Sequence, residues 1–354
     1  MKNKKAVIIL ITMVLVILSS HTVMAKTVAK IGGTSFSSLQ KAADAVKNGQ
    51  TIKLISDVNL KSDVTFRNRV KYTLNLNRHR IHSKAGYSIR IDAGNITIKN
   101  GTVYAPIRIS EKANVTITSG TYKRRKGDSG NILLDNAGKL VIKGGSFNGA
   151  STTSGRKSSV KISGGKFSCT ESAAMAFYFK EGKVSISGGN FNGDVLIGND
   201  ATITISGGSF KGISNSGGKI LIKKAKVNGR LSNAGGTMTI KNGTFHYDGI
   251  QHSYNTKSTD HTTLTVFSGT VKILGGTFTN KYCSVICLHY KNIDVWGPDH
   301  SDETHLIVKG GSIKTTSVNE TPITMSHQVK DKVKLTLNYN AFPGVPIDEV
   351  VSYL

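Results

Sequence analysis

Cysteine is scarce in this chain, with three in 354 residues. Three cysteines are too few for the disulfide framework that stabilises small secreted domains. Cys283 and Cys287 lie four residues apart, which is too far for a bridge within one strand, and a structural zinc site would need a second pair of ligands. The sequence therefore excludes a disulfide-rich or zinc-stabilised module and leaves room for one isolated bridge.

Long hydrophobic runs are missing after residue 25. The one such run, residues 6–18, follows a lysine-rich start and precedes small residues at 23–25. This pattern predicts a secretory signal peptide at 1–25, cleaved before Lys26. The alternative is a retained membrane anchor, although the run is shorter than the roughly 20 residues of a membrane span. We therefore expect a secreted or surface-associated protein with no transmembrane segment after cleavage.

Acidic residues are also few, since 21 Asp and Glu face 47 Lys and Arg, for a net charge of +26. Residues 1–25 hold three lysines and no acid, so their removal leaves +23. A basic exported protein favours polyanionic partners such as acidic polysaccharide or cell-wall polymer, with no specific nucleic acid implied. The alternative is that lysine keeps a stacked sheet soluble and discourages pairing at its edges.

Glycine is abundant, and it marks a repeated phrase. The phrase reads VKISGGKF at 160–167, VSISGGNF at 184–191 and ITISGGSF at 203–210. Alternating apolar residues indicate a short strand, the glycine pair allows a sharp turn, and the last apolar residue begins another strand. Further copies begin at residues 96, 115, 140, 220, 238, 271 and 306, looser ones begin at 74 and 335, and 52–54 opens the series.

A unit this short cannot bury its own apolar face, so repeated units must stack as a solenoid. The phrase predicts an all-β fold, a parallel β-helix of about twelve coils and roughly 55–60 Å in length. One internal position is taken by phenylalanine in successive coils, and we expect these rings to form a buried ladder. They are Phe147, Phe167, Phe191, Phe210, Phe245 and Phe278.

Both ends of such a rod need covers. A helix at 37–46 is predicted for the N-terminal cap, with Ser37 capping its start and Gly49 ending it. Pro343 and Pro346 are expected to stop strand pairing at the other end. The expected organisation is a signal peptide at 1–25, an N-terminal cap at 26–50, a β-helix at 51–342 and a C-terminal cap or tail at 343–354. Two long loop inserts are expected at 246–270 and 279–305.

The segment SFSSLQKAADAVKNGQTIKLISDVNL at 35–60, followed by the glycine-paired coils, resembles the right-handed parallel β-helix, or pectin-lyase-like, superfamily. It is most similar to secreted Gram-positive members without assigned activity. The resemblance covers nearly all of the chain after residue 25 and implies a right-handed helix. Enzymes of this superfamily use clustered aspartates for calcium with an Arg or Lys base, or an Asp pair with Gly-His-Gly. This sequence has neither pattern, so the resemblance transfers no catalytic residue.

Two groups of basic residues are candidates for anion binding. Region 61–90 holds eight Lys and Arg against Asp63 alone, and a second basic loop follows at 123–126. Arginine forks suit carboxylate, sulfate and phosphate. The alternative is the general basicity of the chain. The candidates are Arg67, Arg69, Arg78, Arg80, Lys123, Arg124 and Arg125. A further lysine stripe, interrupted by serines, is interpreted as a solvated face: Lys99, Lys143, Lys223, Lys241 and Lys309.

The window 246–305 differs from the rest, because it carries a net charge of −2, six of the ten histidines and the only tryptophan. Aromatic rings beside carboxylates suit a sugar site. Histidine with aspartate suits a divalent ion such as calcium, or proton transfer. The spacings match neither HExxH nor a calcium loop, so no metal ligand is assigned. The ligand-binding candidates are His246, Tyr247, Asp248, His252, Tyr290, Trp296, Asp299 and His300.

The composition and the missing catalytic pattern favour a secreted, non-catalytic surface or matrix protein that binds an anionic polysaccharide or cell-wall polymer. One alternative is a polysaccharide lyase acting on uronates, with the arginines or the histidines supplying its base. Another is a passive structural or adhesin rod. The oligomeric state is left open.

Overall fold

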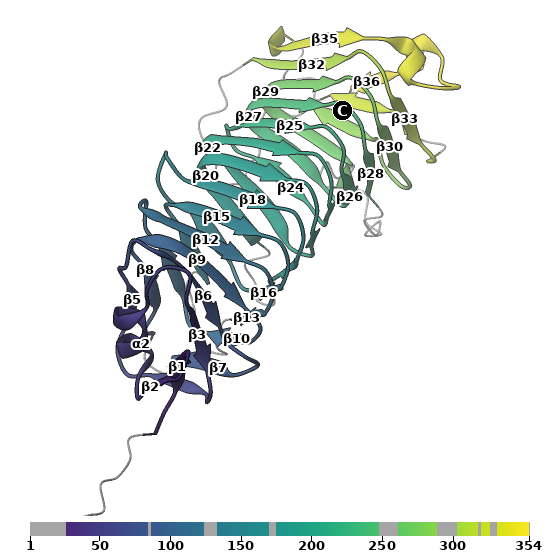
Figure 1. Cartoon of the computed structure of the whole chain (residues 1–354). Coiled ribbons are helices and arrows are strands. Elements are labelled where there is room, and N and C mark those ends of the chain that lie inside the picture. The colour runs from purple at the N-terminus through teal and green to yellow at the C-terminus, as the bar shows by residue number, and fades with distance from the viewer. Residues whose placement is uncertain are drawn as a thin grey trace, which may run out of the picture.

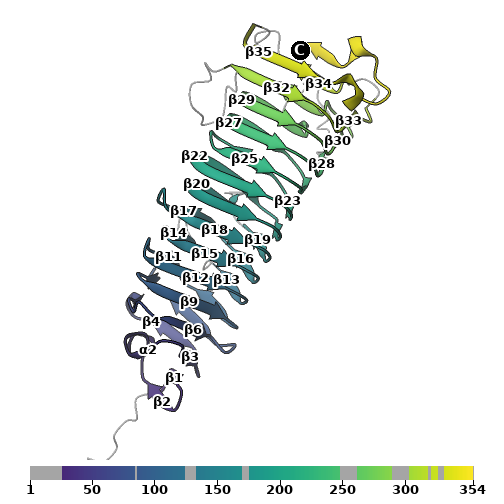
Figure 2. The same cartoon turned by 45° about the horizontal axis from the view of Figure 1, so that its top comes forward.

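The computed structural model describes residues 26–83, 86–123, 133–169, 175–247, 261–288, 303–317, 320–325 and 331–353. These residues form an elongated rod of stacked coils, with the N-terminal helix at one end and the C-terminal strands at the other (Figure 1). Viewed from a second direction, the strands follow one another along the rod in chain order (Figure 2). The structure is a parallel β-helix, as the repeated phrase predicts.

Each coil except the last contributes one strand to each of three faces, and in the last coil two short 3-10 helices stand in place of the face 2 strand. We number the faces in the order in which the chain meets them. Face 1 contains β3 (Thr51–Leu54), β6 (Lys71–Asn75), β9 (Gly94–Lys99), β12 (Ala113–Ile117), β15 (Lys139–Ile142), β18 (Ser159–Ile162), β25 (Lys219–Ile222), β32 (Thr304–Val308) and β35 (Val333–Leu337). Four long strands bend from face 3 into face 1: β20 (Met175–Ile186), β22 (Asp194–Ile205), β27 (Leu231–Ile240) and β29 (Leu264–Ile273).

Faces 2 and 3 complete the cross-section. Face 2 is a sheet of twelve strands: β4 (Val58–Leu60), β7 (Arg80–Ser83), β10 (Thr102–Tyr104), β13 (Thr121–Lys123), β16 (Ser146–Asn148), β19 (Lys166–Ser168), β21 (Asn190–Phe191), β23 (Ser209–Phe210), β26 (Lys226–Asn228), β28 (Thr244–Tyr247), β30 (Thr277–Asn280) and β33 (Ser312–Thr315). Face 3 contains β5 (Val64–Phe66), β8 (Ile89–Ile91), β11 (Ile107–Ile109), β14 (Leu134–Asn136), β17 (Ser151–Thr153), β24 (Ile213–Asn215), β31 (Ile286–Leu288), β34 (Ile323–Met325) and β36 (Val351–Tyr353), with the first halves of the four long strands.

The register confirms that one phrase makes one coil. Val160 pairs with Val184 and Ile162 with Ile186 on face 1, and Phe167 pairs with Phe191 on face 2. The predicted phenylalanine ladder is also confirmed, since all six rings are at most 1% exposed. From Tyr122 to Phe210, consecutive rings on face 2 stack with centroids 4.5–5.0 Å apart. This spacing matches the distance between neighbouring strands, so the core and the backbone share one repeat.

The corner between faces 1 and 2 requires the glycine pair. A Cβ added at Gly164 would lie 2.7 Å from the carbonyl oxygen of Lys143 in the preceding coil. At Gly165 the backbone has φ +113°, and a Cβ would lie 3.2 Å from the Phe167 ring. Glycine is therefore needed both for the backbone angle and for the close stacking of coils.

The N-terminal cap consists of a hairpin and one helix. Helix α2 (Leu39–Ala45) lies within the predicted range 37–46 and buries Leu39, Ala42 and Ala43. Its N-cap is Ser38, whose hydroxyl accepts a hydrogen bond from the Lys41 amide at 3.1 Å. The prediction of Ser37 was therefore wrong by one residue, because Ser38 is the last extended residue before the helix. The helix ends at Ala45, before Gly49, which lies in the following turn with φ +79°.

The antiparallel hairpin of β1 (Ala29–Ile31) and β2 (Thr34–Phe36) was not predicted. Strand β1 pairs with β3 and so covers the first strand of face 1. Helix α2 covers face 3 in a different way. The Gln40 side chain donates to the carbonyl oxygen of Thr65 at 2.9 Å and accepts from its amide at 2.8 Å. The Gln40 side-chain amide thereby occupies backbone groups of β5 that a neighbouring strand would otherwise pair with.

Strand pairing continues past the prolines at the C-terminal end. Pro343 and Pro346 lie between β35 and β36, and β36 pairs in parallel with β34. The expectation that they stop pairing was wrong, because they fall in the turn and not in a strand. Both predicted inserts also contain strand residues, since β29 begins at Leu264 and β31 spans Ile286–Leu288.

Candidate anion-binding surface

Face 1 presents a row of lysines with no acidic residue among them. In the described strands of this face, from β3 to β35, and at the residue that follows each, no outward position holds Asp or Glu. The lysines at these positions are Lys53, Lys71, Lys99, Lys139, Lys143, Lys161, Lys183, Lys219, Lys223, Lys241, Lys272, Lys309 and Lys334. Lys334 pairs with Glu303 at 2.9 Å, and the others form no ion pair with any described residue.

The lysines are spaced so that few stand directly beside each other. In one outward column the order along the rod is Lys139, Ser159, Lys183, Thr202 and Lys219. Lysines two coils apart are separated by about 9–10 Å, because each coil adds about 4.8 Å. That distance is close to the Debye length of about 8 Å at physiological salt, so salt weakens their mutual repulsion. Uncompensated positive charge is therefore tolerable along the whole face.

Face 2 has the same sign of charge. None of its twelve described strands contains Asp or Glu, and Arg80, Lys123, Lys166, Lys226 and Lys314 lie on it. The corner between faces 1 and 2 holds Asp57 in the first coil. The pKa of this carboxyl is held below its ordinary value, chiefly by a hydrogen bond from the Arg80 amide at 2.9 Å. Asp57 therefore stays ionised beside the basic surface.

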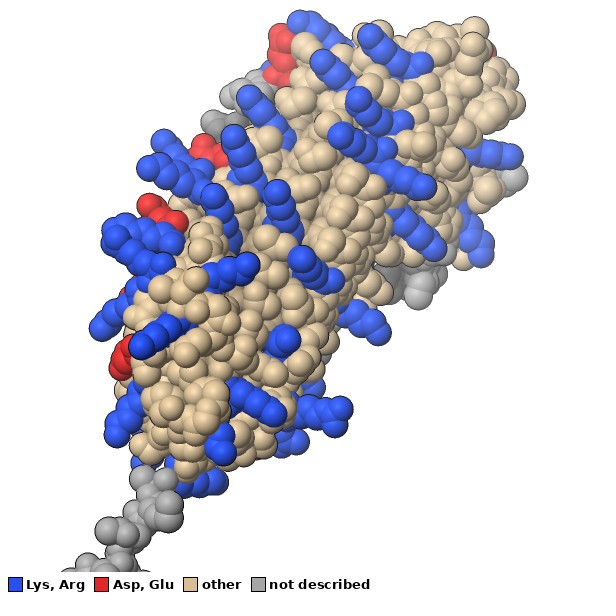
Figure 3. Space-filling model, viewed as in Figure 1, with Lys and Arg blue, Asp and Glu red and all other residues tan. Residues whose placement is uncertain are grey.

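Apart from Asp57, the described acidic residues between β3 and β35 lie on face 3 or at its two corners, which border faces 1 and 2. Glu111, Glu181, Asp200 and Glu303 lie at the corner between faces 3 and 1, and Asp135 lies on face 3. Figure 3 shows Lys and Arg distributed along the visible surface, with Asp and Glu mostly along one long edge. The net positive charge is therefore concentrated on two of the three faces.

The structure separates the four candidate arginines into two pairs. Arg67 and Arg69 follow β5, at the corner between faces 3 and 1. Arg78 and Arg80 lie at the corner between faces 1 and 2, where Arg78 adopts a positive φ of 67°. All four side chains are exposed. The four arginines do not converge on one site, because the two pairs lie at different corners of the coil.

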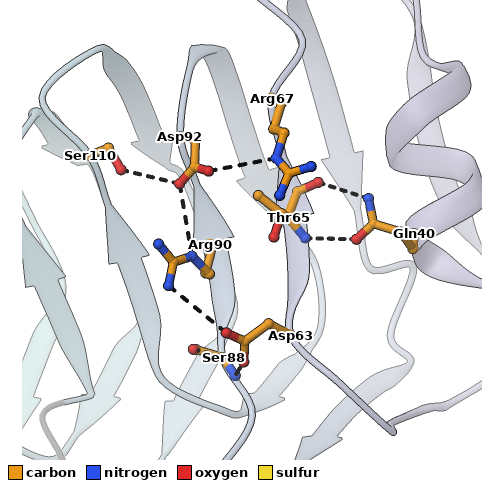
Figure 4. Close-up of polar contacts among 8 residues, drawn as sticks. All are labelled: Gln40, Asp63, Thr65, Arg67, Ser88, Arg90, Asp92 and Ser110. Atoms are coloured by element: carbon orange, nitrogen blue, oxygen red, sulfur yellow. Dashed lines mark hydrogen bonds and ion pairs between the residues drawn. The ribbon is translucent and has the colours of Figure 1, made fainter.

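Arg67 belongs to a mixed-charge network near the helix (Figure 4). Its Nε lies 3.8 Å from Asp92, while Arg90 approaches Asp92 and Asp63, each at 4.0 Å. Asp63 also accepts hydrogen bonds from the amide and hydroxyl of Ser88. Two arginines here face two aspartates, so this group has little charge left to attract an anion. Asp92 lies two residues outside the window 61–90, and the folded register brings it next to Arg67.

Only some of the candidate residues in the loops lie among the described residues. Lys123 is exposed at the end of β13. Arg124, Arg125, Asp248, His252, Tyr290, Trp296, Asp299 and His300 lie outside the described residues, so their roles stay predictions. His246 Nδ1 lies 2.7 Å from Thr279 Oγ1 in the next coil, and the Tyr247 ring lies 6.3 Å from that of His261.

The described histidines of this window occupy two separate places. His246 and His261 lie near the corner between faces 2 and 3, whereas His305 lies on face 1, 3.1 Å from Glu303. In the part of the chain that the structure describes, no group of three or more His, Cys, Asp or Glu could hold a metal ion. Cys169, Cys283 and Cys287 form no disulfide. Burial, with a smaller effect from Glu320, raises the pKa of the Cys283 thiol, which makes it a poor nucleophile at neutral pH.

No helix in the described segments has both the length and the apolar character needed to cross a membrane. Comparison of the chain with protein-family models, with curated proteins and with solved structures found no match. The basis for a function is therefore the arrangement of the three faces and the distribution of charge on them.

Proposed function

We propose that this protein is a secreted or surface-associated β-helix that binds an anionic polysaccharide or cell-wall polymer along faces 1 and 2, without catalysing a reaction on it. The observation that carries the proposal is the row of lysines on face 1 with no acidic residue among its described outward positions. Membership of the pectin-lyase-like superfamily is part of the proposal, and the parallel coils and the helical cap support it.

The binding energy would come from many weak contacts. An exposed lysine–carboxylate contact contributes about 0.2–1 kcal/mol, so a useful affinity requires several contacts at once. A rigid rod supplies them without a large entropic cost, because the lysine positions are already fixed by the strand register. Exposed charge pairs are screened by salt, so binding should weaken steeply as ionic strength rises.

The test uses retention of the chain without residues 1–25 on heparin and on polyuronate columns at increasing salt. The variant Lys139→Glu, Lys161→Glu, Lys183→Glu removes three exposed lysines of face 1. The matched control Lys112→Glu, Lys157→Glu, Lys180→Glu makes the same charge change at the corner between faces 3 and 1. We expect the face 1 variant to elute at much lower salt than the control.

Equal elution of the two variants would show that net charge alone matters and would contradict a binding face. No retention of the native chain would contradict the proposal altogether. Absorbance of unsaturated uronate in the same incubations, with and without calcium, would instead identify a lyase.

A further inference from the structure

The two ends of the rod differ in how they close the core (Figure 1). At the N-terminal end the hairpin and helix α2 cover the first coil, and the inward residues Ile52, Leu54 and Phe66 are buried. At the C-terminal end, among the described strands, β35 pairs only with β32 and β36 only with β34. The core therefore has one closed end and one open end.

The inward positions of the last coil form an apolar surface at the open end. On face 1 these positions of β35 are half-buried, whereas the residues that they pair with in β32 are buried. On face 3 they pair with the buried Ile323 and Met325, yet one is half-buried and the other exposed. We call these five residues the terminal surface: Val333, Leu335, Leu337, Val351 and Tyr353. The end coil of a solenoid needs a polar cover to remain in solution, so an apolar end indicates an interaction site.

Strand β35 also presents an open backbone edge. The Asn338 amide donates to the Val308 carbonyl oxygen in the preceding coil at 2.8 Å. Successive amides of a strand alternate in direction, so those of Val333, Leu335 and Leu337 point away from β32. No described strand pairs with this edge. Proteins commonly protect such an edge with proline or free lysine, but β35 has no proline and its one lysine, Lys334, is paired with Glu303.

The last coil lacks the strong positive charge of the rest of the chain. Residues 331–353 hold two lysines against Asp331, Asp348 and Glu349, which gives a net charge of −1. The chain without residues 1–25 carries +23, so two copies repel each other along faces 1 and 2. At the C-terminal end they can meet with little repulsion.

We infer that the terminal surface binds the terminal surface of a second copy, so that two rods join end to end through antiparallel pairing of their β35 strands. The register that uses all three edge amides places Leu335 opposite the partner's Leu335 and Val333 opposite the partner's Leu337. In this register Lys334 stands opposite the partner's Thr336, and no like charges face each other. A register centred on Lys334 would oppose two lysines and use fewer amides.

The two-fold axis of this pairing passes through Leu335 at right angles to face 1. Rotation about it reverses the strand direction and keeps the inside of the sheet on the same side, so the two cores become continuous. The rotation also brings η3 (Tyr339–Ala341) and η4 (Ile347–Glu349) of each copy towards β36 of the other. The exposed side chains of Tyr339, Ile347 and Tyr353 thereby gain apolar neighbours.

The N-terminal end is a poorer partner for this surface. In its described part, residues 26–50, no large apolar side chain is exposed, and Gln40 already occupies the backbone groups of Thr65. The match for the terminal surface is therefore its own copy. In the resulting dimer, face 1 of both copies points to the same side, which doubles the length of the lysine row.

Sedimentation velocity of the chain without residues 1–25, over a concentration series, measures the association. Small-angle scattering measures the length of the associated species. We expect a reversible dimer whose maximum dimension is about twice that of the monomer. A chain that stays monomeric at every concentration would overturn the inference. So would a dimer no longer than the monomer, or assemblies that keep growing, which would indicate a head-to-tail contact.

Thr336→Lys and Thr336→Glu form a matched pair, because Thr336 points outward beside Ile307 and its replacement leaves the core intact. The lysine would oppose the partner's Lys334 twice in each dimer, whereas the glutamate would attract it. We expect Thr336→Lys to raise the dimer Kd about threefold or more, and Thr336→Glu to leave it at or below the native value. The difference should shrink as salt rises. Thr116→Lys makes the same change on β12 and should leave Kd near the native value.

Leu335→Pro removes the central edge amide without removing a hydrogen bond to β32, because that amide points away from β32. We expect this variant to remain monomeric across the concentration series, with thermal unfolding as the check that the rod is intact. If it dimerises as the native chain does, the contact lies elsewhere and the inference fails. If it does not fold, the Thr336 pair decides, and equal Kd values for its two members would overturn the inference.

Discussion

Phe191 tests whether the aromatic ladder holds neighbouring coils together. The ring is fully buried, and it stacks on Phe167 at 4.5 Å and on Phe210 at 4.7 Å. Phe191→Ala removes both contacts and leaves a cavity, which for a buried phenylalanine costs about 3–5 kcal/mol. Since each coil contacts mainly its neighbours, we expect the loss to be local.

Amide hydrogen exchange measures this effect by position. Amides of β20, β21 and β23 should exchange faster in the variant by a factor matching the lost free energy, about a hundredfold or more. Amides of β3 and β6 should keep their native rates. Val227→Ala is the control, because Val227 occupies the same column without a ring and its loss should cost less. A uniform acceleration along the rod would refute the local picture, and a cost below about 1 kcal/mol would refute the ladder as a stabilising feature.

Three further predictions follow from the turns, the cap and the first coil. Gly164→Ala should lower stability by about 1–3 kcal/mol, since its Cβ meets the Lys143 carbonyl, whereas Gly33→Ala, which has open space, should have little effect on urea unfolding. Ser38→Ala should cost about 1 kcal/mol through the lost N-cap, and Ser37→Ala much less, as thermal unfolding would show; the reverse order would contradict the assigned cap. The lowered pKa of Asp57 means that its carboxylate stabilises the fold above the ordinary value of 3.8, and that this contribution disappears as pH falls through the lower folded value. An NMR titration of Asp57 that gave an ordinary or raised pKa would contradict this.

The sequence predicts the coil well because the same residues recur at the same step. Ile162 and Ile186 point inward and Gly165 and Gly189 turn the chain, and every copy carries the same requirement. The N-terminal hairpin was missed because its strands are three residues each, too short for an alternation to be visible. The Gly32–Gly33 pair between them was the available signal.

The candidate site was harder to predict, because the charged residues that lie next to each other come from different coils and are far apart in the sequence. Arg67 and Asp92 are 25 residues apart, yet Phe66 pairs with Ile91 and brings them together. Likewise, the lysines of face 1 recur at fixed positions of the repeated phrase. Only the assignment of strands to the three faces shows that no acidic residue shares the outward positions of face 1 with them.

The pairing of Gln40 with Thr65 has a consequence for how these molecules meet one another in solution. A single side-chain amide occupies the backbone groups of Thr65 on the face 3 rim of the first coil, so another chain finds these groups already paired. The molecule thus protects itself against end-on addition at this rim, at the cost of one residue in a short helix.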